Sequence, residues 1–184
     1  MRSKTAALLS LAIAIPALAL TLAGVNMEDH TTVGGQSLVL NGAGLRKKLF
    51  IKVYVGGLYL PAKNANAGAI LAADAPRRQV MHFLYSVSKS QMCDAWDEGL
   101  EDNTKNPSAE VKAGFKTLCS WMEPIPKGNR LILTYVPGTG TTVEVNGKAK
   151  GTLPGKPTAD AILATWVGPK PGPCDDFKNA VLGK

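Results

Sequence analysis

The chain has 184 residues, of which 45% are hydrophobic and 19% are charged, and its formal net charge is +7 at pH 7. This length favours one domain that buries its own core. The basic residues are scattered and form no long block, so a nucleic-acid partner is not expected. Weak attraction to anionic lipid or to a carboxylate ligand stays open.

Residues 1–23 have the pattern of a signal peptide. Arg2 and Lys4 precede an uncharged apolar run, and small residues up to Ala23 suit a signal peptidase. We therefore expect export, either to the periplasm or out of the cell. A retained membrane anchor is the alternative, because residues 6–23 approach the ~20 apolar residues that span a bilayer. This segment, if uncleaved, is the only membrane contact that we expect.

Residues 24–36 are polar and contain glycine, which indicates a flexible lead-in or a frayed strand. The folded domain is expected over residues 37–184. Within it, β-branched, aromatic and leucine residues predict strands over residues 37–40 and 49–60. Tight bends or bulges are expected at the glycines in and between these strands. These glycines occupy positions 42, 44, 56 and 57.

Helical and alternating patterns follow one another through the rest of the chain. Apolar residues three or four positions apart predict helices, whereas strict alternation predicts strands. The expected helices cover residues 64–73, 88–103, 107–122, 158–167 and 175–182, and the expected strands cover 79–87, 130–136, 141–145 and 149–153. Ser88 or Ser90 suits the cap of the first long helix, and Asn146-Gly147 predicts a type I′ hairpin turn.

This order of elements predicts an α+β fold. Strands and helices occur in separate runs, and hairpin signals join the later strands. The sheet is therefore expected to be antiparallel, with the helices packed on one of its faces.

The cysteines leave their pairing open. Cys93, Cys119 and Cys174 allow at most one intramolecular disulfide. Cys93 and Cys119 fall on two successive helical patterns, Cys174 is an equally available partner, and three buried free thiols are also consistent with the sequence. His30 and His82 are far from any cysteine pair with metal-ligand spacing. We expect no metal ion and no cofactor.

One apolar run contains an arginine and two tyrosines, Arg46, Tyr54 and Tyr59. A basic strand end and ordinary packing would explain them, but a guanidinium and a phenol also make a receptor for a carboxylate. An apolar cavity would then hold the rest of the ligand. An unbroken strand would separate Arg46 and Tyr59 by ~43 Å and point them to opposite faces. Their cooperation requires a reversal or bulge, at residues 47–50 or at Gly56-Gly57.

Several runs, in the same order, resemble the chalcone isomerase-like family. The first is LNGAGLRKKLFIKVYVGGLYLP, and the others are KGNRLILTYVPGTGTTVEVNGKAKGTLPG, ADAILATWVGPKP and FKNAVLGK. The resemblance covers residues 37–184 and points to the exported bacterial branch of the family. It implies an open-faced β-sandwich, in which helices are layered on one face of a large antiparallel sheet and a cleft lies between them.

The resemblance also implies a pocket. The family includes plant enzymes that close chalcones to flavanones and fatty-acid binders without that activity, and Arg46 matches the pocket arginine of the G-x-G-x-R motif in both. A further tyrosine completes the carboxylate site of the binders, for which Tyr59 fits best and Tyr54 is the second choice. We therefore expect a monomer that binds a fatty acid or a similar apolar anion. Its expected wall residues are Phe83, Trp96, Phe115 and Trp166.

The helix that begins near residue 88 departs from the plant enzymes. They carry a tyrosine, a lysine and an asparagine where this chain has Gln91, Asp94 and Glu98 by approximate register. These changes argue against flavonoid cyclisation. An isomerase that acts as an intramolecular lyase is the alternative function, with Arg46 stabilising an oxyanion and Thr158 as a second catalytic residue. A non-catalytic structural module of the cell envelope is the third possibility.

Overall fold

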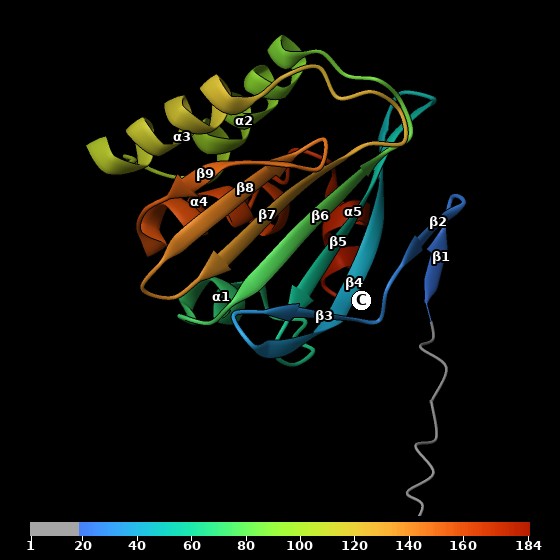
Figure 1. The fold of residues 1–184 in the computed structure, drawn as a ribbon, viewed down its shortest axis with the longest axis horizontal. Helices are drawn as coiled ribbons and strands as arrows, with labels where there is room; N and C mark the ends of the chain where they lie inside the picture. Colours follow the sequence, from blue (N-terminus) through green and yellow to red (C-terminus); the bar gives the residue numbers. More distant parts are fainter. Residues whose placement is uncertain (1–18) are drawn as a thin grey trace, which may run out of the picture.

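The computed structural model of the chain describes residues 19–184, so most of the expected signal peptide lies outside the described part. None of the helices in that part has the length and apolar character needed to cross a bilayer. Figure 1 shows a curled sheet with helices along one side.

The described part contains nine strands and five helices. The strands are β1 (Leu20–Leu22), β2 (Val25–Met27), β3 (His30–Val33), β4 (Gln36–Lys48), β5 (Ile51–Leu60), β6 (Arg77–Phe83), β7 (Arg130–Val136), β8 (Gly140–Val145) and β9 (Lys148–Leu153). The helices are α1 (Ala67–Ala72), α2 (Lys89–Asn103), α3 (Ala109–Trp121), α4 (Lys156–Val167) and α5 (Asp175–Val181).

The large sheet is antiparallel throughout. Its seven strands lie in the order β3-β4-β5-β6-β7-β8-β9, so strands that follow one another in the chain are neighbours in the sheet. A separate two-stranded ribbon consists of β1 and β2. The α+β fold expected from the sequence, with helices layered on a large antiparallel sheet, is confirmed.

The main core lies between the helices and one face of the sheet. It contains Phe83 and Leu131 of the sheet together with Leu118 of α3 and Trp166 of α4, all of them buried. Burying such side chains stabilises the fold by about 1.5–3 kcal/mol each. The period of two in β6 and β7 turns Met81, Phe83, Leu131 and Leu133 toward this core.

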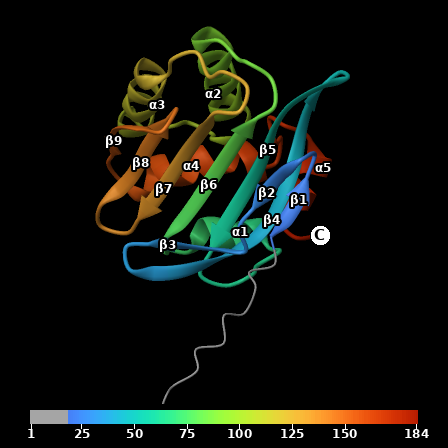
Figure 2. The ribbon, with the colours of Figure 1, turned by 45° about the vertical axis from the view of Figure 1, so that its right-hand side comes forward.

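A second core lies on the opposite face of the sheet. Val25 and Met27 of β2 pack there with Leu38, Val55 and Tyr59 of β4 and β5. Figure 2 shows the β1–β2 ribbon on one side of β4 and α5 on the other. Residues 24–36 therefore contain two strands with buried side chains, so of the two expectations for this segment the strand describes it better than the flexible lead-in. The apolar residues of this segment are buried because they pack on β4 and β5, which follow later in the sequence.

Gly44 and Gly56 allow close packing of helix α5 on strands β4 and β5. The sequence predicted tight bends or bulges at the glycines: a register shift does occur between Leu40 and Gly42, and β4 then continues through Gly44 to Lys48 without a further shift until Arg46. A Cβ at Gly44 would lie 2.8 Å from the ring of Phe177 on α5, and one at Gly56 would lie 2.6 Å from it. The missing side chains therefore let α5 approach β4 and β5 closely.

The α2–α3 hairpin follows its sequence signals. Ser88 caps α2, accepting from the backbone N–H of Gln91 while the Gln91 side chain accepts from the Ser88 N–H. Helix α3 begins at Ala109, two residues later than expected, and Ser108 caps it by accepting from the backbone N–H of Val111. A disulfide between Cys93 and Cys119 ties the two helices together, and Cys174 is free and exposed.

Candidate functional site

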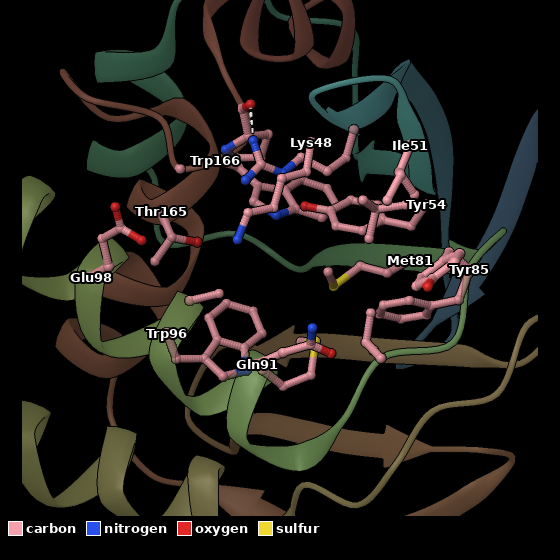
Figure 3. Close-up of a pocket in the computed structure, with 18 residues that line it drawn as sticks. Lys48, Ile51, Tyr54, Met81, Tyr85, Gln91, Trp96, Glu98, Thr165 and Trp166 are labelled. Carbon is pink, nitrogen blue, oxygen red and sulfur yellow. Dashed lines mark hydrogen bonds between the residues drawn. The ribbon is translucent and has the colours of Figure 1, made fainter.

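A cavity of about 190 Å³ lies between the sheet and helices α2 and α4. Its lining is mostly apolar, with a few polar groups at one end and around the opening. The sheet, helix α2, and helix α4 with the segment after it all contribute to the lining. From the sheet side come Arg46, Lys48, Ile51, Tyr54, Met81, Phe83 and Tyr85, from α2 come Gln91, Met92, Trp96 and Glu98, and from α4 and the following segment come Thr165, Trp166 and Pro173. Figure 3 shows the residues of α2 facing Tyr54 and Trp166 across this space.

Arg46 and Tyr54 are neighbours across β4 and β5. The chain reverses at Leu49 and Phe50, within the region where the sequence required a reversal, and this places Arg46 directly opposite Tyr54. A register shift follows immediately, since Lys47 pairs with Lys52. Such a bulge re-aims the side chains beside it. Both Arg46 and Tyr54 line the cavity.

The Arg46 guanidinium is anchored by the segment that joins α4 to α5. Its Nη1 donates a hydrogen bond to the backbone carbonyl of Pro173, on the segment between α4 and α5. Within residues 19–184, no carboxylate forms an ion pair with Arg46. A half-buried guanidinium without a counter-ion is suited to an anionic ligand, because it offers several donors in a fixed plane.

Tyr54 offers a neutral donor beside that cation. Burial raises the pKa of its phenol far above the ordinary value, although the Arg46 charge opposes the shift. The ring centroid lies 5.5 Å from that of Phe83, 6.3 Å from that of Trp166 and 5.7 Å from that of Phe177. This aromatic packing fixes the ring, so the hydroxyl keeps its proton and its position.

Tyr59 lies on the other face of the sheet. It packs in the second core beside Met27, and its Cα partner across the strands is Leu40. Burial, followed by the carboxylate of Glu28, raises the pKa of its phenol to about 12. The expected partnership of Arg46 with Tyr59 is therefore corrected, because Tyr54 occupies the position beside Arg46.

Three of the four expected wall residues line the cavity. Phe83, Trp96 and Trp166 do so, whereas Phe115 of α3 is buried in the main core outside it. The Nε1 atom of Trp96 is buried and has no hydrogen-bond partner among the described residues. An unpaired donor in the lining of a cavity is available to an acceptor on a ligand.

The pocket threonine of α4 is Thr165 and not Thr158. Thr158 is buried against Gly114 of α3 and is absent from the cavity lining. Thr165 lies two helical turns further along the same face, lines the cavity, and donates from Oγ1 to the Ile162 carbonyl at 2.8 Å. Trp166, which was expected from the sequence to lie in the cavity wall, is adjacent to Thr165, so the same helical turn of α4 could have been recognised as facing the cavity.

The helix that departs from the plant pattern does border the cavity. Gln91 and Glu98 of α2 are exposed residues of its lining, and Asp94 is not part of the lining. His82 lies outside it too, where burial lowers the pKa of its imidazole. The lining thus combines an unpaired cation, a fixed phenol and apolar walls, an arrangement suited to holding an apolar anion.

Comparisons with known proteins agree with this architecture. A family model described as chalcone isomerase-like matches residues 19–183. The structure is similar to the crystal structure of a fatty-acid binding protein from Arabidopsis thaliana, with a TM-score of 0.69 and 17% sequence identity, over 91% of this chain and 97% of that chain. At this identity, the likeness speaks for the fold alone. No curated protein sequence matches the chain.

Proposed function

Since this chain belongs to the chalcone isomerase-like family, we propose that it binds a fatty acid or a similar apolar anion in the cavity between its sheet and α2. The observation that carries the proposal is the Arg46 guanidinium, which lines an apolar cavity opposite Tyr54 and has no carboxylate partner within residues 19–184. The ligand carboxylate would pair with Arg46 and accept a hydrogen bond from the Tyr54 hydroxyl. The fold neighbour that is named a fatty-acid binding protein supports the same class of ligand.

The size of the cavity limits what it encloses. At about 190 Å³ it is smaller than the ~300–1,000 Å³ of pockets that take drug-sized ligands. A short carboxylic acid would be enclosed completely. The tail of a long one would leave between the exposed lining residues Lys48, Tyr85 and Gln91. Octanoate should therefore bind with most of its chain buried, and palmitate with part of its chain outside.

Binding measurements on purified protein test the role of Arg46. In Arg46→Ala, the Kd for octanoate and for palmitate should rise roughly 10- to 100-fold, because a charged hydrogen bond is worth about 1.5–3 kcal/mol. The neutral analogue octanol should bind wild type and variant equally. Arg130→Ala is the matched control, since Arg130 is exposed and lies outside the cavity. Native mass spectrometry and calorimetry provide the readouts.

Two results would contradict the proposal. One is wild-type protein that carries no lipid after purification and takes up neither acid. The other is an Arg46→Ala variant that binds both acids as tightly as wild type.

We also propose that the protein is exported from the cytoplasm and belongs to the exported bacterial branch of the family. The signal-peptide pattern of residues 1–23 and the Cys93–Cys119 disulfide support this, because disulfides persist in oxidising compartments. Fractionation of the producing cells, with sequencing of the N-terminus of the recovered protein, tests the location and the cleavage near residue 23. Uncleaved protein in the cytoplasm would contradict it.

An intramolecular lyase is the second candidate, favoured by the same Arg46–Tyr54 pair. A guanidinium and a phenol in an apolar cavity also stabilise a developing oxyanion. The carboxylate of Glu98 in the lining would repel a phenolate substrate, which counts against this candidate. Chalcone cyclisation by the purified protein at the spontaneous rate would remove this candidate, while leaving the binding proposal intact.

A further inference from the structure

The tip of the β4–β5 hairpin, residues 47–52, exposes two large apolar side chains. Leu49 and Phe50 are 87% and 89% exposed, the highest values among the large hydrophobic residues of the described part. The end of the β4–β5 hairpin projects beyond the other strands of the sheet (Figure 2). Single exposed apolar residues are common on proteins, but two adjacent ones on a projecting turn form a compact apolar point.

This turn goes against the local preferences of hairpins. Two-residue turns favour Asn and Gly because they need left-handed backbone, yet Leu49 has a φ of 55°. Lys47 and Lys52 stand directly opposite each other across the strands, where like charges repel. Unfavourable local choices of this kind are expected where a function requires them.

The charged side chains of the hairpin tip itself, residues 47–52, are all lysines. Lys47, Lys48 and Lys52 are exposed, and none of them forms an ion pair within residues 19–184. No acidic residue occurs between positions 46 and 73. Apolar side chains surrounded by lysines match the interface of an anionic bilayer, where the apolar groups enter the acyl boundary and the ammonium groups meet phosphates.

We infer that the hairpin tip docks the protein on an anionic lipid bilayer, with Leu49 and Phe50 inserted and the three lysines at the headgroups. Tyr85 adds an amphipathic ring beside the tip. It is 52% exposed, and its backbone N–H donates to the carbonyl of Val53 at 3.2 Å. A protein partner fits less well, because stable interfaces bury ~800 Å² on each side and two side chains supply far less.

The docked orientation would bring the cavity to the membrane. Lys48, Ile51 and Tyr85 belong both to the surroundings of the tip and to the cavity lining (Figure 3). An apolar anion would then pass between bilayer and cavity along the hairpin. This consequence rests on the proposed function, whereas the docking itself rests on the hairpin alone.

A probe on the tip tests the docking independently of the N-terminal segment. An environment-sensitive dye is attached to Phe50→Cys in a Cys174→Ser background of the full chain as it is purified, and vesicles of phosphatidylcholine with or without phosphatidylglycerol are added. The dye should shift to the blue with phosphatidylglycerol vesicles and stay unchanged with phosphatidylcholine alone. The same dye on Lys112→Cys of α3, which lies away from the hairpin (Figure 1), should not respond.

Charge reversal provides the second arm. Lys47→Glu with Lys52→Glu should weaken the dye response about 30-fold or more in apparent affinity, since each lysine contributes about 1 kcal/mol near an anionic surface. Lys112→Glu with Lys116→Glu on α3 is the control and should change it little. Octanoate binding should be unaltered in all of them, so that failure of docking and failure of ligand binding are told apart.

An unresponsive tip in the presence of phosphatidylglycerol vesicles overturns the inference, even if the protein sediments with them through its N-terminal segment. Equal responses to both vesicle types, or responses that survive the reversal of Lys47 and Lys52, also overturn it. If the dye on the tip responded only to an added protein and not to vesicles, the tip would be a protein-binding surface and docking on a bilayer would be excluded.

Discussion

Tyr54 and Tyr59 lie an odd number of positions apart on β5, and this spacing points their rings to opposite faces of the sheet. Only one of them can therefore share the cavity with Arg46. Which one depends on where the chain reverses, and the reversal at Leu49 and Phe50 selects Tyr54. The sequence left two places for the reversal, residues 47–50 and Gly56-Gly57, because the turn that forms contains neither glycine nor asparagine to mark it.

The two tyrosines make a matched pair of variants. Tyr54→Phe keeps the aromatic packing and removes the hydroxyl, so the Kd for octanoate should rise roughly 2- to 10-fold, as expected for one hydrogen bond of about 0.5–1.5 kcal/mol. Tyr59→Phe should leave the Kd unchanged, because its ring lies in the second core. Calorimetric titration measures both. A larger loss in Tyr59→Phe would mean that the ligand binds on the opposite face of the sheet.

At the scale of elements, the hairpin of β4 and β5 links the cavity to the apolar tip. It carries Leu49 and Phe50 at its turn, and Arg46 and Tyr54 only a few residues from that turn. Strand β4 continues through Gly42 and Gly44, where α5 and the segment after it pack directly on the strand. One hairpin thus carries both the proposed anion receptor and the exposed apolar point.

Replacement of Leu49 should separate stability from docking. Leu49→Gly removes left-handed strain from an exposed side chain, so the free energy of unfolding should rise by up to about 1 kcal/mol, partly offset by the flexibility of glycine in the unfolded chain. Binding to phosphatidylglycerol vesicles should weaken. Phe50→Ser should weaken binding as well, without the gain in stability. Urea unfolding and vesicle titration measure the two effects, and a Leu49→Gly variant less stable than wild type would contradict the expected relief of strain.

At the scale of the whole molecule, the wall of the cavity depends on how the layers are held together. Helix α2 contributes Met92 and Trp96 to the lining, and the disulfide from Cys93 to Cys119 binds it to α3. The sheet holds the opposite wall, and α4 closes the space between them. The site therefore belongs to the assembled layers and to no single element.

Loss of the disulfide should weaken the entire fold. The double variant Cys93→Ala with Cys119→Ala should lower the free energy of unfolding by about 3.5 kcal/mol, because a crosslink spanning 26 residues restricts the unfolded chain. Reduction of the wild-type protein should have a similar effect. Cys174→Ala is the control, since that thiol is free and exposed. Equal stability of the double variant and wild type in urea would show that the bond is unformed or without effect.

Local patterns in the sequence determined most of the elements. The capped start of α2 at Ser88, the turn at Asn146-Gly147 and the alternation in β6 each depend on neighbours a few positions away. From these patterns the order of strands and helices, and with it the α+β class, could be predicted. Arg46 was singled out by its chemistry and by a family resemblance over several runs, and the structure brings it to the lining of the cavity.

Tertiary structure alone decided which distant residues meet. Tyr54 in place of Tyr59, Thr165 in place of Thr158, and the absence of Phe115 from the cavity wall all follow from register and from the packing of helices on the sheet. The burial of Val25 and Met27 likewise required the far face of β4 and β5. Periodicity shows which face of an element is apolar, but it does not show which of two apolar faces encloses a cavity, because that depends on partners far away in the chain.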